Sequence, residues 1–240
     1  MEWKMQVYKT WWIKKDRNFG DILTPYILDY FQIPYTYSKL RRNADIMCIG
    51  SIADRAESDT IVLGSGILKS KEPVCKDANW KFVRGPLTRK KIIDCGGYCP
   101  EIYGDPALFL SEFLPKVKIT HNIGIVPHFV DYEYVLNKYK NTSYKIINVV
   151  NDNPLEVAKE ISSCEYIISS SLHGIICAHA YNIPAAWAEF NKKKYHGDQI
   201  KYFDYYASLD LHPKLSTVEN PEFQLGSPNL SPARQIFNSL

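Results

Sequence analysis

The chain has 240 residues, a hydrophobic fraction of 45%, a charged fraction of 23% and a net charge of +3 at pH 7. This composition is typical of a folded globular protein and excludes a disordered chain, and the weak positive charge argues against nucleic acid as a partner. The length exceeds one average domain, so either one large α/β domain or two small domains that share a cleft are compatible with it. Small anions are compatible ligands.

The first residues, MEWKMQVYKTWWIKK, contain no apolar run of about 7–15 residues such as a signal peptide has, and no run of about 18 apolar residues follows. We therefore expect a soluble, cytoplasmic protein. Six cysteines are scattered along the chain, several in contexts typical of buried free thiols. Cys95 and Cys99 have the spacing C-x3-C, but zinc signatures usually need a second pair, so we expect no metal site.

Short β-branched or aromatic segments alternate with amphipathic segments in the first half of the chain. This alternation is typical of strands and helices around a mostly parallel sheet, so the predicted fold class is α/β. The predicted strands cover residues 6–11, 45–50, 60–63 and 80–83, and the predicted helices cover 21–31 and 86–93.

The alternation starts again after Leu114-Pro115. It predicts two Rossmann-like domains, at 1–116 and 117–212. In the second domain the predicted strands cover 123–126, 145–150, 166–169 and 185–188, and the predicted helices cover 132–139, 154–162 and 173–181. Residues 213–240 form a predicted tail that packs back on the first domain; its part at 214–231 is rich in Pro, Ser and Asn and predicts a surface segment, before a final helix at 232–239.

The turn after the predicted strand at 166–169 is the first candidate site. In open α/β sheets, ligands bind beyond the carboxyl ends of the strands. This strand is followed by Ser170, Ser171, Leu172, His173 and Gly174. The unpaired N–H groups and the dipole of a helix N-terminus favour an anion, and serine hydroxyls can donate to phosphate oxygens. We expect an anion beside His173; the alternative is that the serines only cap the helix and His173 is a surface residue.

Arg84 follows the predicted strand at 80–83 and is the second candidate. Gly85 permits a close approach, and Pro86 suits the first position of a helix. Because a guanidinium matches a carboxylate or phosphate with two parallel hydrogen bonds, Arg84 would suit a doubly anionic ligand. The alternative is a solvated arginine at the start of a helix.

Two further loops carry weaker signals. Asn18 and Asp21 belong to an Asn-Phe-Gly-Asp segment that opens the first long helix, where Asp21 either caps the helix or reaches into the cleft. Gly64, Ser65 and Gly66 follow an apolar strand and would let the backbone come near a ligand.

Three more segments complete the candidate set. His128 ends the strand at 123–126, so it is expected to face the same crevice. The Gly-Asp-Pro-Ala segment at 104–107 is interpreted as a structural turn. The segment at 191–198 and Lys201 are expected to form a cationic rim, although most such charges are solvated.

Seven segments together resemble the polysaccharide pyruvyl transferase family, and they follow the family's order over about residues 15–208. They are NFGD at 18–21, IVLGSGI at 61–67, VRGPLT at 83–88, YGDPALFL at 103–110, IGIVPH at 123–128, SLHGIICAHAYNIP at 171–184 and GDQIKYFDYY at 197–206. The resemblance implies two domains related to B-type glycosyltransferases, with phosphoenolpyruvate as donor and a pyruvate ketal on a sugar as product.

The resemblance also assigns residues. Arg84 matches the arginine of the family's R-G-P element and His173 the histidine of its L-H-G element, both associated with binding or turnover of phosphoenolpyruvate. Lys201 matches a later lysine that contacts the donor. Many members carry Arg directly before Leu-His-Gly, where this chain has Ser171, so donor binding would depend on Arg84, Lys201 and the helix N-terminus.

By this resemblance the chain is an enzyme of polysaccharide biosynthesis, such as capsule or exopolysaccharide assembly, with phosphoenolpyruvate as co-substrate and no cofactor. The acceptor would be a sugar or a lipid-linked oligosaccharide, which would bring peripheral membrane association. We expect protonated His173 to supply or relay a proton to the donor, and His128 or Asp21 to deprotonate the acceptor. Two rival functions stay open: a nucleotide-sugar-dependent glycosyltransferase and a non-catalytic glycan- or phosphate-binding protein.

Overall fold

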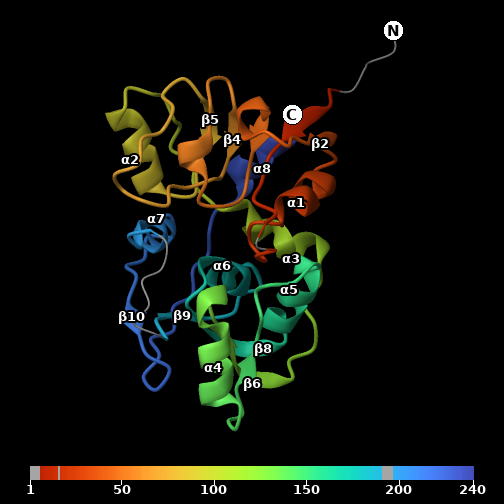
Figure 1. Cartoon of the computed structure of the whole chain (residues 1–240), viewed down its shortest axis with the longest axis vertical. Coiled ribbons are helices and arrows are strands. Elements are labelled where there is room, and N and C mark those ends of the chain that lie inside the picture. Colours follow the sequence, from red (N-terminus) through yellow and green to blue (C-terminus); the bar gives the residue numbers. More distant parts are fainter. Residues whose placement is uncertain (1–5, 16, 191–196) are drawn as a thin grey trace.

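The computed structural model describes residues 6–15, 17–190 and 197–240. Within these ranges the strands form two five-stranded sheets, and every pair of neighbouring strands in them is parallel. Helices connect the strands, so the predicted α/β class is confirmed. The two sheets lie one above the other along the long axis of the molecule (Figure 1).

The first sheet has the strand order β2-β1-β3-β4-β5. Its strands are β1 (Tyr8–Thr10), β2 (Tyr35–Tyr37), β3 (Ile46–Met47), β4 (Ile61–Leu63) and β5 (Asn79–Phe82). The helical elements of this half are α1 (Thr24–Tyr30), η1 (Arg41–Asn43), η2 (Ala53–Arg55), α2 (Pro86–Asp94), η3 (Pro106–Phe109) and α3 (Leu110–Phe113). The sequence pattern predicts the strands at β1, β3, β4 and β5 but not β2.

The second sheet has the strand order β10-β9-β8-β6-β7. Its strands are β6 (His121–Val126), β7 (Lys145–Ile146), β8 (Cys164–Ser169), β9 (Ala185–Ala188) and β10 (Leu215–Ser216). Its helical elements are η4 (Phe129–Asp131), α4 (Tyr132–Tyr139), α5 (Pro154–Ser162), α6 (Leu172–Ala180) and α7 (Ile200–Ala207), and the chain ends with α8 (Ser231–Phe237). Helix α7 and strand β10 are absent from the elements that the sequence predicts, and β7 ends at Ile146, four residues before the end of the predicted strand at 145–150.

Helix α6 lies between the second sheet and the first half of the chain. Every residue from Leu172 to His179 is buried, which explains why its sequence is apolar on all sides. The largest hydrophobic cluster includes Leu63 and Phe82 of the first sheet as well as Ile167 of the second. The core is therefore continuous from one sheet to the other, and it holds the loops at their facing ends in fixed positions.

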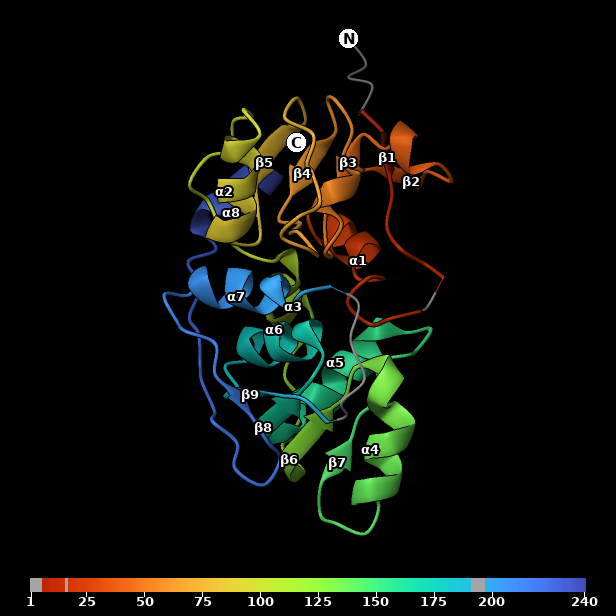
Figure 2. The ribbon, with the colours of Figure 1, turned by 60° about the vertical axis from the view of Figure 1, so that its left-hand side comes forward.

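The last residues return to the first sheet. The ring of Phe237 is stacked on Phe31 with centroids 4.3 Å apart and meets Phe82 and Phe109 edge-on. Strand β1 and helix α8 therefore lie at the same end of the molecule (Figure 2). The segment at 214–231, predicted as a surface excursion, is partly incorporated in the second sheet: β10 pairs with β9, and Gln224 forms a bridge with Ala185. Without this pairing, β9 would be an edge strand with unpaired backbone N–H and C=O groups.

All six cysteines are free thiols. Over residues 6–15, 17–190 and 197–240, the helices are too short or too polar for any of them to cross a bilayer.

Candidate active site

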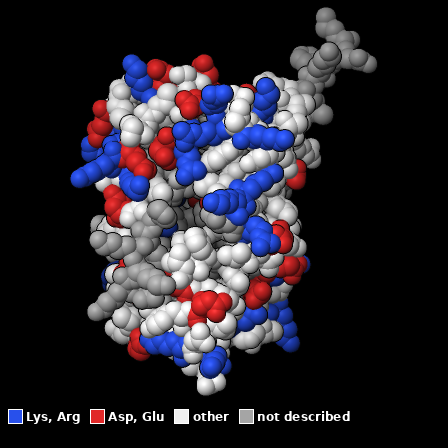
Figure 3. All heavy atoms as spheres, in the orientation of Figure 1, with Lys and Arg blue, Asp and Glu red and all other residues white. Residues whose placement is uncertain are grey.

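A cavity of about 140 Å³ lies where the two halves of the chain meet. The face shown in Figure 3 is hollowed between the halves, and Lys and Arg side chains gather on the first half above the hollow. The cavity volume is below the range of about 300–1,000 Å³ that is typical of drug-sized ligands, so it suits a small molecule. Its wall consists of Ile13, Asn18, Asp21, Ser51, Arg55, Leu68, His128, Phe129, Ser171, Leu172, His173 and Lys201.

The turn between β8 and α6 forms one wall of the cavity. Ser171 is the N-cap residue of α6, and its side chain makes no capping hydrogen bond. Ser171, Leu172 and His173 line the cavity, as expected for residues just beyond the carboxyl end of a parallel strand. Helix α6 thus starts at the cavity.

Two predicted members of this turn have structural contacts instead. The Ser170 hydroxyl donates to Asp131 Oδ2 over 3.1 Å and accepts from the His128 backbone N–H over 2.8 Å, so Ser170 fixes His128 and does not line the cavity. A Cβ atom on Gly174 would lie 2.5 Å from Ser169 Oγ, so Gly174 allows α6 to pack on β8.

His173 is almost buried, with 8% of its surface exposed. Its Nε2 atom lies 3.5 Å from Oδ2 of the fully buried Asp105, while the other carboxylate oxygen of Asp105 accepts a hydrogen bond from the Ala107 N–H at the start of η3. The other edge of the ring packs on Gly20, where a Cβ atom would come within 1.9 Å of Nδ1. Asp105 and Gly20 therefore hold the imidazole in one orientation, with a carboxylate oxygen beside Nε2.

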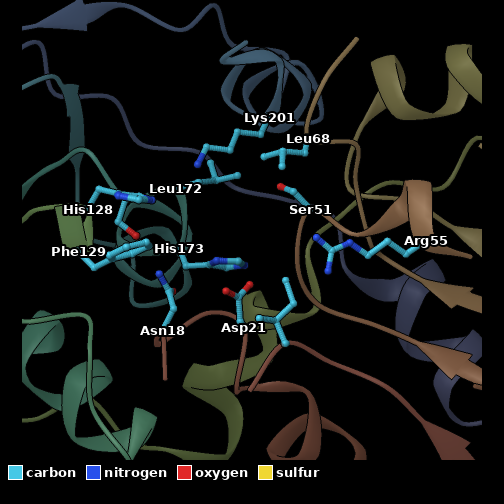
Figure 4. A pocket seen from close by; sticks show the side chains of 12 residues that line it. Asn18, Asp21, Ser51, Arg55, Leu68, His128, Phe129, Leu172, His173 and Lys201 are labelled. Atoms are coloured by element: carbon cyan, nitrogen blue, oxygen red, sulfur yellow. The ribbon is translucent and has the colours of Figure 1, made fainter. Parts of the chain in front are cut away.

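Asp21 and Asn18 line the cavity from the turn before α1 (Figure 4). The Asn18 side chain accepts a hydrogen bond from the Gly20 N–H, and the Phe19 N–H donates to the Val149 carbonyl over 2.7 Å. This turn is thus anchored to the second half of the chain. Asp21 does not cap α1, whose N-cap position is Leu23.

His128 lies across the cavity and is held through its backbone. It is the N-cap residue of η4, its Nδ1 atom accepts from the Val130 N–H over 3.4 Å, and its ring lies 4.4 Å from that of Phe129. His128 therefore lines the same cavity as His173, where the sequence led us to expect it.

Two cations reach the cavity from different elements. Lys201 enters from α7 and Arg55 from η2, with the hydroxyl of Ser51 on the same side as Arg55 (Figure 4). Burial, together with the nearby charge of Arg84, lowers the pKa of Lys201 from 10.5 to about 8, against the opposing effect of Asp21. An anion in the cavity would reverse this shift because it would favour the charged ammonium.

Arg84 does not line the cavity, in contrast to the prediction that it faces the ligand. Its side chain has no exposed surface, and its Nε donates to Asp204 Oδ2 over 3.2 Å. Its remaining contacts are Nη1 to Ser51 Oγ at 2.8 Å and Nη2 to the Ile67 carbonyl at 2.9 Å. The carboxylate that the guanidinium binds belongs to the protein, because α7 carries Asp204 to this position.

The Gly64-Ser65-Gly66 loop also approaches the protein itself. A Cβ atom on Gly64 would lie 2.4 Å from Pro106, and one on Gly66 would lie 2.2 Å from the Arg84 guanidinium carbon. The buried Ser65 hydroxyl donates to the Gly50 carbonyl. None of the three residues lines the cavity.

The cationic rim expected at 191–198 falls mostly outside the described residues, because the structure does not describe 191–196. Asp198, at the end of that segment, accepts hydrogen bonds from both the backbone N–H and the hydroxyl of Ser70. The described part of the chain contains no group of three His, Cys, Asp or Glu side chains that could hold a metal ion.

Sequence reasoning does not identify Asp105, Ser51 or Arg55 as site residues. Ser51 follows β3, so the strand-end rule could have found it. Asp105 follows Tyr103, which bridges to Val83 beside β5, but the Gly-Asp-Pro-Ala pattern favours a turn. Arg55 has no pattern that separates it from a surface arginine.

Together these features define an α/β protein with a small, cationic cavity at the facing ends of two parallel sheets, lined by two histidines and a carboxylate. The chain belongs to the polysaccharide pyruvyl transferase family, whose sequence model matches residues 6–189.

Two relatives show the range of the similarity. The uncharacterized protein L143 of Acanthamoeba polyphaga mimivirus is 29% identical over 222 residues, which cover 87% of this chain and 76% of L143. The succinoglycan biosynthesis protein ExoV of Rhizobium meliloti (strain 1021) is 27% identical over 192 residues, which cover 72% of this chain and 57% of ExoV. No solved structure matches the chain.

Proposed function

We propose that this protein transfers the pyruvyl group of phosphoenolpyruvate to two hydroxyls of a sugar and so forms a pyruvate ketal in polysaccharide biosynthesis. The observation that carries the proposal is His173 held between Asp105 and Gly20 in the wall of a small cationic cavity. Membership of the pyruvyl transferase family and the similarity to a succinoglycan biosynthesis protein support it.

The donor would lie between Lys201 and Arg55. Phosphoenolpyruvate has a carboxylate and a phosphate, and these two cations enter the cavity from different elements. They offset the donor's charge, while N–H groups at the start of α6 can donate to its oxygens. Arg55 would compensate for the arginine that many family members have at the position of Ser171, since both residues line the cavity.

His173 would protonate the donor. The enol phosphate needs a proton on C3 before its C2 becomes electrophilic, and a protonated imidazole is a general acid that can supply it. Asp105 would keep the ring oriented and stabilise its positive charge, as a buried carboxylate does for a catalytic histidine.

The complete reaction requires two bonds to form at C2. A sugar hydroxyl attacks C2, the C2–O bond to phosphate breaks, and a second hydroxyl closes the ketal. Of the two hydroxyl protons, one replaces the proton delivered to C3 and the other leaves with phosphate. Asp21 and His128 line the same cavity, and we assign to them the removal of these protons.

The proposal also covers the domain organisation, the compartment and the acceptor. We propose that the two sheets are two domains, 1–116 and 117–212, in an arrangement related to B-type glycosyltransferases, followed by the tail at 213–240. The protein would work in the cytoplasm without a cofactor, on a sugar or lipid-linked oligosaccharide acceptor, and would reach the membrane through that acceptor.

A two-part experiment tests the function. Thermal-shift titration compares phosphoenolpyruvate with nucleoside diphosphates, and we expect stabilisation by phosphoenolpyruvate. A panel of saccharides is then screened for phosphate release and for a product that gains a pyruvate ketal in its mass spectrum. Stabilisation by nucleoside diphosphates would favour a glycosyltransferase. If phosphoenolpyruvate binds but no saccharide in the panel causes release of phosphate, a binding protein would be favoured.

A further inference from the structure

Asp204 of α7 is enclosed by the loop at the start of α2. Its Oδ2 atom accepts hydrogen bonds from Arg84 Nε at 3.2 Å and Thr88 Oγ1 at 2.7 Å, and its Oδ1 atom accepts from the Thr88 N–H at 2.9 Å. The side chains of Arg84 and Asp204 have no exposed surface. A buried carboxylate with this many partners fixes its helix, because any displacement would leave charges unpaired in the interior.

Gly85 belongs to the same contact. A Cβ atom at this position would lie 1.9 Å from the Asp204 backbone carbonyl oxygen and 2.7 Å from its Oδ1. The φ angle of Gly85 is −161°, which any residue can adopt, so the glycine serves the close approach of α7 and not a special backbone conformation. Arg84, Gly85 and Thr88 thus all act on one residue of α7.

Lys201 is carried by the same helix, one turn before Asp204, so both side chains lie on the same side of α7. The next residue of α7 makes a second attachment, because the Tyr202 hydroxyl donates to the Ser170 carbonyl over 2.7 Å. Helix α7 is therefore held between the loop before α2 and the turn before α6, and Lys201 reaches the cavity between these two attachments.

We propose that the contact between Arg84 and Asp204 is a clamp that fixes α7 and thereby sets the position of Lys201 in the cavity. Arg84, Gly85, Thr88 and Asp204, together the Asp204 clamp, are positioning residues and do not touch the donor. The proposal rests on the proposed function only in taking phosphoenolpyruvate as the anion that Lys201 meets. It explains why an Arg-Gly-Pro element that suits an anionic ligand is buried behind the cavity wall.

The test uses Gly85→Ala, which inserts a methyl group between α2 and α7 without changing any charge. The first measurement is the pKa of Lys201, from the pH dependence of its acylation followed by peptide mass mapping. Among the described residues, Arg84 and Asp21 act on this pKa, and His128, His173 and Arg55 line the same cavity; all five are the same in the variant. A shift therefore reports movement of α7. We expect the pKa to rise from about 8 by on the order of one unit, because a displaced ammonium is better solvated.

The second measurement is phosphoenolpyruvate affinity by calorimetry in a double-mutant cycle. Gly85→Ala should weaken binding about tenfold or more, the size of one lost charge-assisted hydrogen bond, but should have little further effect in a Lys201→Met background. Lys90→Ala is the matched control on α2, since Lys90 is exposed and pairs with Asp94. It should match the wild type in both measurements.

If Gly85→Ala does not fold, Thr88→Val is the second variant: it removes the hydroxyl that donates to Asp204 and accepts from the Ile67 N–H, and it keeps every charge. An unchanged Lys201 pKa in the folded variant overturns the clamp, as does an equal loss of affinity with and without Lys201. If phosphoenolpyruvate fails to bind even the wild type, the proposed function fails, while the acylation measurement still decides whether the clamp positions Lys201.

Discussion

Asp105 and His173 face each other in the wall of the cavity, with 3.5 Å between Oδ2 of Asp105 and Nε2 of His173. Neither atom has a hydrogen-bond partner in the described part of the chain. A buried polar atom without a hydrogen-bond partner has an energetic cost, so this pair is a candidate for a role in the reaction and not only in folding.

The first prediction concerns Asp105→Asn. Asparagine keeps an oxygen that can accept the Ala107 N–H but removes the charge that supports His173. We expect kcat for phosphate release to fall by about 10²-fold or more, and the affinity for phosphoenolpyruvate to change little. His173→Ala should lower kcat by about 10²–10⁴-fold. A normal kcat in Asp105→Asn would show that Asp105 only caps η3.

The second prediction concerns Gly20→Ala. The added methyl group would collide with the His173 ring, which cannot retreat because Asp105 lies at its other edge. We expect kcat to fall by about as much as in His173→Ala, with the protein still folded by circular dichroism. Gly96→Ala is the control: its positive φ of 83° costs about 1 kcal/mol of stability, but it has open space and lies outside the cavity wall. A Gly20→Ala enzyme with normal turnover would contradict this position of the ring.

The third prediction is a pH dependence of stability. Because the folded pKa of Lys201 is about 8 and its ordinary value is 10.5, the ammonium destabilises the folded apo protein fully below pH 8. Between pH 8 and 10.5 the folded state has lost the proton while the unfolded state keeps it, so this destabilisation decreases as the pH rises. Lys201→Met should therefore melt at a higher temperature than the wild type at pH 7, with the difference diminishing toward pH 10. A constant difference over this range would contradict the lowered pKa.

The fourth prediction follows from the same residue in the complex. An anion in the cavity favours the ammonium form of Lys201, so phosphoenolpyruvate should bind with uptake of a proton at pH 9. Calorimetry in buffers of different ionisation enthalpy measures this uptake. The Lys201→Met variant should show none, and equal uptake by both proteins would assign the proton to another group.

The fifth prediction concerns the C-terminal helix. Phe237 has 1% of its surface exposed and packs on three other phenylalanine rings of the first half. Phe237→Ala should lower the free energy of unfolding by about 3–5 kcal/mol, measured by chemical denaturation. Tyr98→Ala, at a site that is 78% exposed, should change it by less than about 0.5 kcal/mol. A neutral Phe237→Ala would mean that α8 does not contribute to folding.

The sequence was enough for the α/β fold class, and it also predicted where a candidate site lies. Apolar segments of strand length, each followed by a helical period, require parallel strands, and parallel strands bring their carboxyl ends to one edge. This reasoning placed His128, Ser171 and His173 in one region, although Ser171 and His173 follow His128 by 43 and 45 residues in the sequence. The resemblance in seven ordered segments added Lys201.

The tertiary structure alone decided what each polar group faces. Arg84 stands between a strand and a helix, where an anion ligand is expected, yet its anion is Asp204, from a helix that the sequence pattern does not predict. Asp105 has the sequence of a turn, yet its free carboxylate oxygen faces His173. Sequence periodicity reports which side of an element is buried, whereas the partner of a buried charge depends on packing between elements that are far apart in the chain, and only the folded structure brings those elements together.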